Sequence, residues 1–191
     1  MSRSSHIIPV VILCCLPLLT NAQRHYRHYS ETYYAIGAEI NPVPFINGGY
    51  YGSLWWGMKH VRLRGIASYT TVPGFLVTEG FEQNRVRSYA LLGDYFFHEA
   101  FKGLWAGGGF EYWQGSTINS DDLTEGKYTN YVLTLDVGYL LKVWRNFYVS
   151  PSGSVHMVVA GDKVIEVGNA TFNSPTISPS ITITIGYHYR L

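Results

Sequence analysis

The sequence predicts an all-β protein, a closed barrel of eight antiparallel strands that run up and down across a membrane. Three observations predict this fold: repeated segments alternate apolar and polar side chains, the joins between them alternate between short and long, and the last segment ends in a distinctive motif. Successive side chains of a strand point to opposite faces. Each segment therefore has one apolar and one polar face, which suits a barrel with lipid outside and a polar lumen.

The first four predicted strands lie at residues 33–41, 49–58, 61–69 and 87–98. The polar faces of three of them carry ionic side chains, which are Glu39, Arg62, Arg64 and Asp94. The segment 49–58 is assigned as a strand by its place between two others and by its aromatic residues. Its faces stay open, because Trp55 and Trp56 are adjacent and cannot both face lipid.

The last four predicted strands lie at residues 104–114, 131–143, 149–159 and 180–191. Their polar faces carry four further ionic side chains, which are Glu111, Asp136, Lys142 and Arg190. In the final segment Ile181, Ile183 and Ile185 alternate with serine and threonine. Each segment has about ten residues, the length that a tilted membrane strand needs.

The joins between the segments predict which ends of the strands lie together. Short joins fall at 59–60, 99–102 and 145–146, whereas long polar joins fall at 71–86, 116–127 and 160–176. The first join, 42–48, is short and holds two prolines. Bacterial barrels have short periplasmic turns and longer outer loops. An even number of strands then places both termini in the periplasm and every long join outside.

The N-terminus predicts export from the cytoplasm. Arg3 precedes an apolar run, residues 7–19, and Ala22 ends a small-residue cleavage site. This is the pattern of a secretory signal peptide, and the run is too short for a membrane helix. We therefore divide the chain into a signal peptide, a periplasmic segment and a barrel domain, at 1–22, 23–32 and 33–191. Both cysteines lie in the signal peptide, so no disulfide or thiolate metal site is expected afterwards.

Charge and small residues exclude other classes of protein. The chain has 14 Lys and Arg against 13 Asp and Glu, and loss of Arg3 with the signal peptide leaves the two signs balanced. A nucleic-acid partner is not expected, because it requires a basic face. A soluble β-sandwich or lipocalin-like barrel also fits the alternation. The polar faces, however, are rich in glycine and serine, which suit a crowded lumen better than a surface in water.

The last residues carry the most specific motif. Thr184, Gly186, Tyr189 and Leu191 follow a spacing that resembles the C-terminal signal of bacterial outer-membrane β-barrels, although the family usually ends in Phe. Length and strand number resemble the small barrels of the porin-like superfamily typified by the OmpA transmembrane domain and OmpX. The resemblance implies a monomer in the outer membrane of a Gram-negative bacterium. Its expected partners are membrane lipid, lipopolysaccharide and the barrel assembly machinery.

The inward faces predict a network of ion pairs in the lumen, because buried charges are costly unless they are paired. Its expected members are Glu39, Arg62, Arg64, Asp94, Glu111, Asp136, Lys142 and Arg190. Within it, the ends of neighbouring strands should bring Arg62 and Arg64 to Asp94. An eight-stranded barrel has room for little beyond its side chains, so we expect a plugged lumen.

The function predicted from this architecture is a structural or interaction role, without cofactor or metal. One alternative is a narrow channel for small or apolar solutes. A second is an enzyme that modifies lipid A, since lipid A deacylases use a His and a Ser two residues apart. Ser154 and His156 have this spacing in the reverse order and on the inward face. We therefore predict that the pair is structural and that the protein is not an enzyme.

Overall fold

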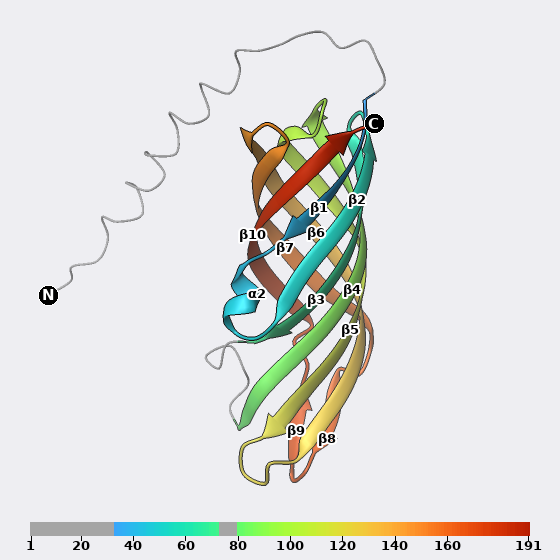
Figure 1. The fold of residues 1–191 in the computed structure, drawn as a ribbon. Helices are drawn as coiled ribbons and strands as arrows, with labels where there is room; N and C mark the ends of the chain where they lie inside the picture. The colour runs from blue at the N-terminus through green and yellow to red at the C-terminus, as the bar shows by residue number, and fades with distance from the viewer. Residues whose placement is uncertain (1–32, 73–79) are drawn as a thin grey trace, which may run out of the picture. The chain divides into compact units, whose positions relative to one another are not determined.

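The computed structural model describes residues 33–72 and 80–191. The predicted signal peptide, the segment 23–32 and part of the join 71–86 lie outside the described residues. The described chain forms a ring of antiparallel strands in the order β1-β10-β7-β6-β5-β4-β3-β2, and hydrogen bonds between β1 and β10 close it (Figure 1). The predicted fold class, a closed eight-stranded up-and-down barrel, is confirmed.

The ring is built from strands of very different length. Its strands are β1 (Tyr34–Ile40), β2 (Tyr50–Met58), β3 (Val61–Thr71), β4 (Phe81–His98), β5 (Lys102–Asn119), β6 (Glu125–Trp144), β7 (Phe147–Gly161) and β10 (Ile177–Arg190). A short helix, α2 (Val43–Ile46), joins β1 to β2. Outside the ring, β8 (Val164–Val167) and β9 (Ala170–Asn173) form a separate hairpin. Within the part of the chain that the structure describes, no helix is long and apolar enough to cross a bilayer.

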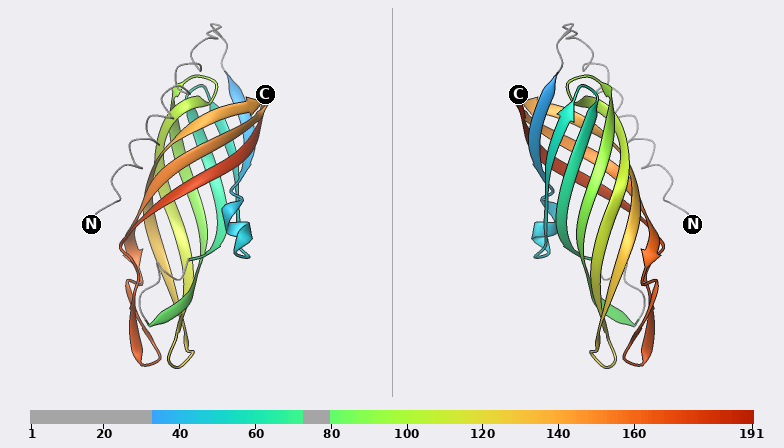
Figure 2. Two further views of the ribbon diagram at one scale, coloured as in Figure 1. Left: turned by 90° about the vertical axis from the view of Figure 1, so that its left-hand side faces the viewer. Right: turned by 90° about the vertical axis from the view of Figure 1, so that its right-hand side faces the viewer.

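The two ends of the barrel differ. The short turns after β2, β4 and β6 lie at the end where β1 begins and β10 finishes, which we call the inner end. The opposite, outer end carries α2 and the β8–β9 hairpin, and β4 to β6 reach far beyond α2 there (Figure 2). β6 has 20 residues and β1 has 7. Since about 10 residues cross a membrane, the long strands continue past it at the outer end.

Two of the predicted long joins are therefore largely strand. β5 and β6 remain paired at 116–118 and 125–127, and the β8–β9 hairpin occupies the middle of 160–176. Apolar–polar alternation does not identify such strands, because outside the membrane neither face has to contact lipid. Backbone pairing continues all the same, since it needs only a neighbouring strand.

The two faces of the wall differ as predicted, with apolar side chains outside and polar ones inside. The large exposed apolar residues of the ring include Ile36, Leu54, Leu63, Leu91, Phe110, Leu135, Val155 and Ile181. The open question in β2 is also settled, since Trp55 is 4% exposed and Trp56 is 46% exposed. A soluble barrel would bury the apolar face, so this distribution is that of a barrel surrounded by lipid.

Candidate functional site

Charged side chains from four strands meet inside the inner half of the lumen. Arg64 donates twice to Asp94, from Nε to Oδ2 and from Nη2 to Oδ1, each at 2.7 Å. Arg62 donates from Nε to the same Oδ2, also at 2.7 Å. Arg64 also reaches Asp136 on β6. The two-pronged Arg64–Asp94 pair has the geometry of a strong, charge-assisted interaction. The structure thus brings Arg62, Arg64 and Asp94 together at one point.

Glu39 extends this group toward β2 and β7. Arg62 Nη1 donates to Glu39 Oε1 at 2.7 Å, and the hydroxyl of Tyr148 donates to the same oxygen at 2.8 Å. Ser53 donates to the other oxygen, and the indole of Trp55 donates to the Tyr148 oxygen at 2.7 Å. We call the five ionic residues the inner ionic cluster; they are Glu39, Arg62, Arg64, Asp94 and Asp136.

The inner ionic cluster is almost completely inaccessible to solvent. Arg62 has no exposed surface, and Asp94 and Glu39 are each 2% exposed. Charges in such a place are stable only while every one of them has partners. The five side chains therefore depend on one another.

Aromatic rings fill the lumen between this cluster and the inner end. The inner aromatic cluster consists of Ala35, Trp55, Phe96, Phe101, Trp105, Leu140 and Tyr148. The guanidinium of Arg62 lies 5.0 Å from the ring centre of Phe96 and 5.2 Å from that of Trp105. Cations are attracted to aromatic faces at such distances. The rings therefore pack against the inner ionic cluster on the side of the inner end.

Glycines make room for these large side chains. A Cβ on Gly138 would lie 2.5 Å from the Trp105 ring and 2.8 Å from a backbone oxygen of Pro151. A Cβ on Gly107 would lie 2.3 Å from the carboxylate of Asp94. Contacts this short do not occur, so the packing of the lumen requires glycine at both positions.

A second polar group lies farther toward the outer end. Glu111 accepts hydrogen bonds from Ser88, Trp113 and Thr134 at 2.7–2.9 Å. Its Oε1 also lies 3.2 Å from Nδ1 of His156, whose Nε2 lies 3.0 Å from Oγ of Ser180. We call Glu111, Thr134, His156 and Ser180 the His156 chain. Its members come from four adjacent strands: β5, β6, β7 and β10.

Two residues of the predicted ionic network lie outside both the inner ionic cluster and the His156 chain. Lys142 and Arg190 follow the inward register of their strands, but both lie near the inner end and are exposed. The guanidinium of Arg190 lies over the ring of Tyr33, 5.1 Å from its centre. A strand register alone does not show where the lumen ends, and this is why the sequence placed these two inside. The other six predicted residues lie inside, five in the inner ionic cluster and Glu111 in the His156 chain.

The Ser154–His156 pair also lies inside the lumen, but the imidazole contacts other groups. Ser154 is opposite Ser180 on β10 and opposite Asp136 on β6. The hydroxyl that contacts His156 is that of Ser180. Sequence analysis missed Ser180, Thr134 and Tyr148 as site residues. A partner on a neighbouring strand leaves no spacing signal in the sequence.

The parts of β4 to β6 that reach beyond α2, together with the β8–β9 hairpin, form the outer extension of the barrel. It has a small core of its own, which we call the outer cluster. It consists of Phe81, Tyr128, Val167 and Phe172. The Tyr128 hydroxyl donates to Asn84 at 2.9 Å, and Asn119 donates to the backbone of Val167 at 3.0 Å. The β8–β9 hairpin is therefore packed against the ends of β4 and β6.

The residues of the predicted assembly signal alternate between the faces of β10. Thr184 and Gly186 point inward and are buried, and a Cβ on Gly186 would lie 2.2 Å from the Tyr148 ring. Tyr189 and Leu191 are exposed, at 58% and 64%. The glycine therefore also has a packing role in the inner half of the lumen.

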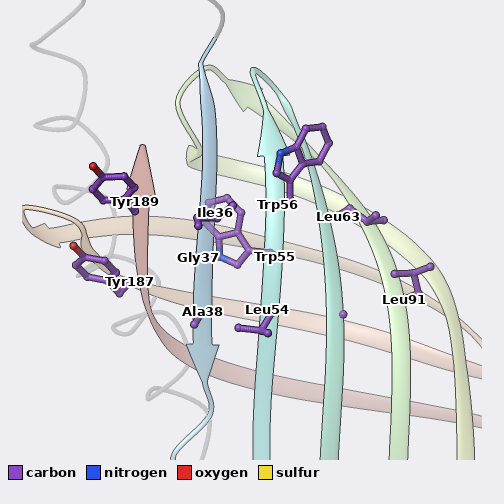
Figure 3. A pocket seen from close by; sticks show the side chains of 11 residues that line it. Ile36, Gly37, Ala38, Leu54, Trp55, Trp56, Leu63, Leu91, Tyr187 and Tyr189 are labelled. Carbon is purple, nitrogen blue, oxygen red and sulfur yellow. The ribbon is translucent and has the colours of Figure 1, made fainter. Parts of the chain in front are cut away.

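An open apolar groove of about 630 Å³ lies on the lipid-facing wall (Figure 3). Its lining residues are Ile36, Gly37, Ala38, Leu54, Trp55, Trp56, Leu63, Gly65, Leu91, Tyr187 and Tyr189. Ala38 and Gly65 are small and outward-facing, so they leave room between their larger neighbours. Trp55 reaches it from the inner side of the wall, where its ring packs against Gly37.

Among the described residues, no group of three or more His, Cys, Asp or Glu side chains could hold an ion. The ionic side chains of the lumen are instead arranged in pairs of opposite sign or with hydroxyl and indole donors.

No protein-family model matches the sequence, and no curated protein matches it. Similar solved structures include the following two. Neisserial surface protein A, from Neisseria, aligns with a TM-score of 0.46 and 10% identity over 84% of this chain and 97% of that one. A major outer membrane protein from Thermus thermophilus aligns with a TM-score of 0.49 and 12% identity over 83% of this chain and 99% of that one. At this level of identity neither comparison assigns a function.

Proposed function

We propose that this protein is an outer-membrane barrel of a Gram-negative bacterium with a structural or interaction role and a lumen that does not conduct. The lipid-facing belt supports the membrane location, and the C-terminal motif supports the outer membrane and delivery by the barrel assembly machinery. The extension of β4 to β6 and the β8–β9 hairpin support an interaction role, because they present folded protein beyond the bilayer.

One observation carries the non-conducting lumen: Arg62 has no exposed surface in the middle of the inner half. Its guanidinium is enclosed by Glu39 and Asp94 and by the rings of the inner aromatic cluster. In an open pore, an arginine side chain at this depth would be exposed to water. Ions could therefore cross the lumen only if both the inner aromatic cluster and the inner ionic cluster were displaced.

Planar-bilayer recordings test this proposal. We expect the wild-type barrel to stay silent under applied voltage. A double variant, Phe101→Ala with Trp105→Ala, removes two rings of the inner aromatic cluster and should give discrete openings. The matched control is Trp56→Ala, which removes a ring of similar size from the lipid-facing side. Steady conductance in the wild type would refute the sealed lumen and favour the narrow channel.

A further inference from the structure

The His156 chain has the connectivity of a nucleophile, a base and an orienting acid. Ser180 Oγ lies 3.0 Å from one ring nitrogen of His156, and Glu111 Oε1 lies 3.2 Å from the other. A serine hydroxyl is a weak nucleophile by itself, and an adjacent base held by a third group activates it. Here three strands supply these three groups, and none of the three belongs to the inner ionic cluster.

The hydrogen bonds around the imidazole assign its tautomer. Thr134 donates its proton to Glu111 Oε1 at 2.7 Å and lies 2.9 Å from His156 Nδ1. With that hydroxyl proton committed to the carboxylate, Nδ1 carries the ring proton and points it at Glu111 and Thr134. Nε2 is then the basic nitrogen, and it faces the Ser180 hydroxyl. This is the arrangement that a general base for Ser180 requires.

Neighbouring side chains hold the acid and the ring in place. Trp113 and Ser88 donate to Glu111 Oε2 at 2.7 and 2.9 Å. The ring centres of Trp113 and His156 are 5.4 Å apart. These donors fix Oε2 of Glu111, while its Oε1 faces both Thr134 and His156. A reactive group needs such support, because small displacements lower its rate strongly.

Solvent reaches this part of the lumen, unlike the inner half. The side chain of His156 is 17% exposed, and Ser180 is half-buried. The inward-facing residues around Ser180 are also small and half-buried: Ser152, Ser154, Ser178 and Thr182. Ser180 therefore lies in a part of the lumen with exposed surface, on the outer side of the sealed inner half.

We propose that Ser180 is the nucleophile and His156 the general base of an esterase site that hydrolyses small, neutral carboxylic esters. Glu111 is the positioning residue that orients the imidazole. The narrow lumen sets the size of the substrate, and the nearby Glu111 disfavours an anion. This inference departs from the sequence-based prediction of a barrel without enzymatic activity. It is independent of the non-conducting lumen, which is tested by conductance.

The proposed reaction needs no group beyond these residues and water. Ser180 Oγ bonds to the ester carbonyl carbon while its proton passes to His156 Nε2. The tetrahedral intermediate collapses, the bond to the alcohol oxygen breaks, and the alcohol leaves with the proton from His156. Water then attacks the acyl-serine, His156 takes its proton and returns it to Ser180 Oγ, and the carboxylic acid leaves.

Hydrolysis of p-nitrophenyl acetate by the full barrel folded in detergent tests the proposal. We expect a rate above that of detergent alone, and a loss of about 100-fold or more of this excess in Ser180→Ala and in His156→Gln. Ser152→Ala and Ser154→Ala, which change hydroxyls on the same inner face, should keep the wild-type rate. A wild-type rate equal to that of Ser180→Ala would overturn the proposal.

A covalent probe provides a second readout that does not depend on turnover. A fluorophosphonate should bond to Ser180 Oγ with loss of fluoride, and peptide mass spectrometry should locate it there. Ser180→Ala removes only a half-buried hydroxyl, so heat-modifiable migration on a gel should show it folded. Labelling at another serine, or none in the folded wild type, would contradict the assignment.

Glu111 needs a test that separates positioning from packing. Glu111→Gln should lower kcat for p-nitrophenyl acetate with little change in KM, because the substrate does not contact this residue. Glu111→Asp, which restores the carboxylate, should recover part of kcat. Equal kcat in Glu111→Gln and wild type would show that the carboxylate only fills the lumen.

Discussion

The inner and outer halves of the lumen are built from similar polar residues but differ in hydration. In the inner half Arg62 and Asp94 are dry, and their groups are paired with charges of opposite sign or covered by rings. In the outer half Glu111 is bonded to neutral donors and to a histidine that is partly exposed. The difference shows that charged groups at one depth of a barrel can contribute to its stability, while at another depth the imidazole of His156 stays accessible to solvent.

The largest expected effect comes from unbalancing the inner ionic cluster. Arg64→Met keeps much of the side-chain length but leaves Glu39, Asp94 and Asp136 with Arg62 as the one base of the cluster. Breaking a buried ion pair in this way costs about 3–5 kcal/mol. Urea unfolding in detergent should show this loss in the free energy of unfolding.

The matched control is Arg87→Met, because Arg87 is exposed on β4. It should change the free energy of unfolding by less than about 0.5 kcal/mol. Equal effects of the two substitutions would mean that the inner half does not depend on charge balance.

The second effect is large but local to the outer extension. Phe172 is 1% exposed and packs against Phe81 and Tyr128. Phe172→Ala should cost about 3–5 kcal/mol in the packing of the β8–β9 hairpin. Protease cleavage within 164–173 should become faster while the barrel keeps its unfolding midpoint. Val164→Ala, at a side chain that is 61% exposed, is the control and should leave cleavage unchanged.

A smaller effect is expected from overpacking the inner half. The Cβ of Gly138→Ala would press on the Trp105 ring and on the backbone of Pro151. Overpacking of this kind costs about 1–3 kcal/mol. Gly93→Ala is the matched control, since its Cβ would meet nothing within 4 Å. If both variants unfold at the same urea concentration, the tight packing of the inner half is not under strain.

The smallest effect concerns the turn between β5 and β6, outside the membrane. The backbone N–H of Thr124 donates to Asp122 at 2.9 Å and lowers the pKa of that carboxyl. A lowered pKa stabilises the turn above the unfolded value of about 3.9, and the effect disappears as pH falls through the folded value. The protection factor of the Thr124 amide, which is the intrinsic exchange rate divided by the observed rate at the same pH, should therefore fall on acidification, whereas in Asp122→Ala it should be low at every pH.

Much of the fold was accessible from sequence because alternation reports the two faces of a membrane barrel directly. Ile181, Ile183 and Ile185 are exposed to lipid, and Glu39, Arg62, Arg64 and Asp94 lie inside, as their registers predict. Trp55 and Trp56 were not predictable, because either tryptophan suits either face. The β8–β9 hairpin was missed because strands outside the membrane need no apolar stripe.

The sequence by itself determined which side chains point into the lumen, because a strand has a period of two residues and lipid accepts only one of its faces. Only the tertiary structure decided which inward groups meet. The closure and stagger of the ring bring Ser180 to His156 and leave Lys142 and Arg190 at an exposed end. The depth of a side chain in the lumen and its contacts with other strands both depend on the stagger between neighbouring strands. The alternation of side chains within one strand does not reveal this stagger.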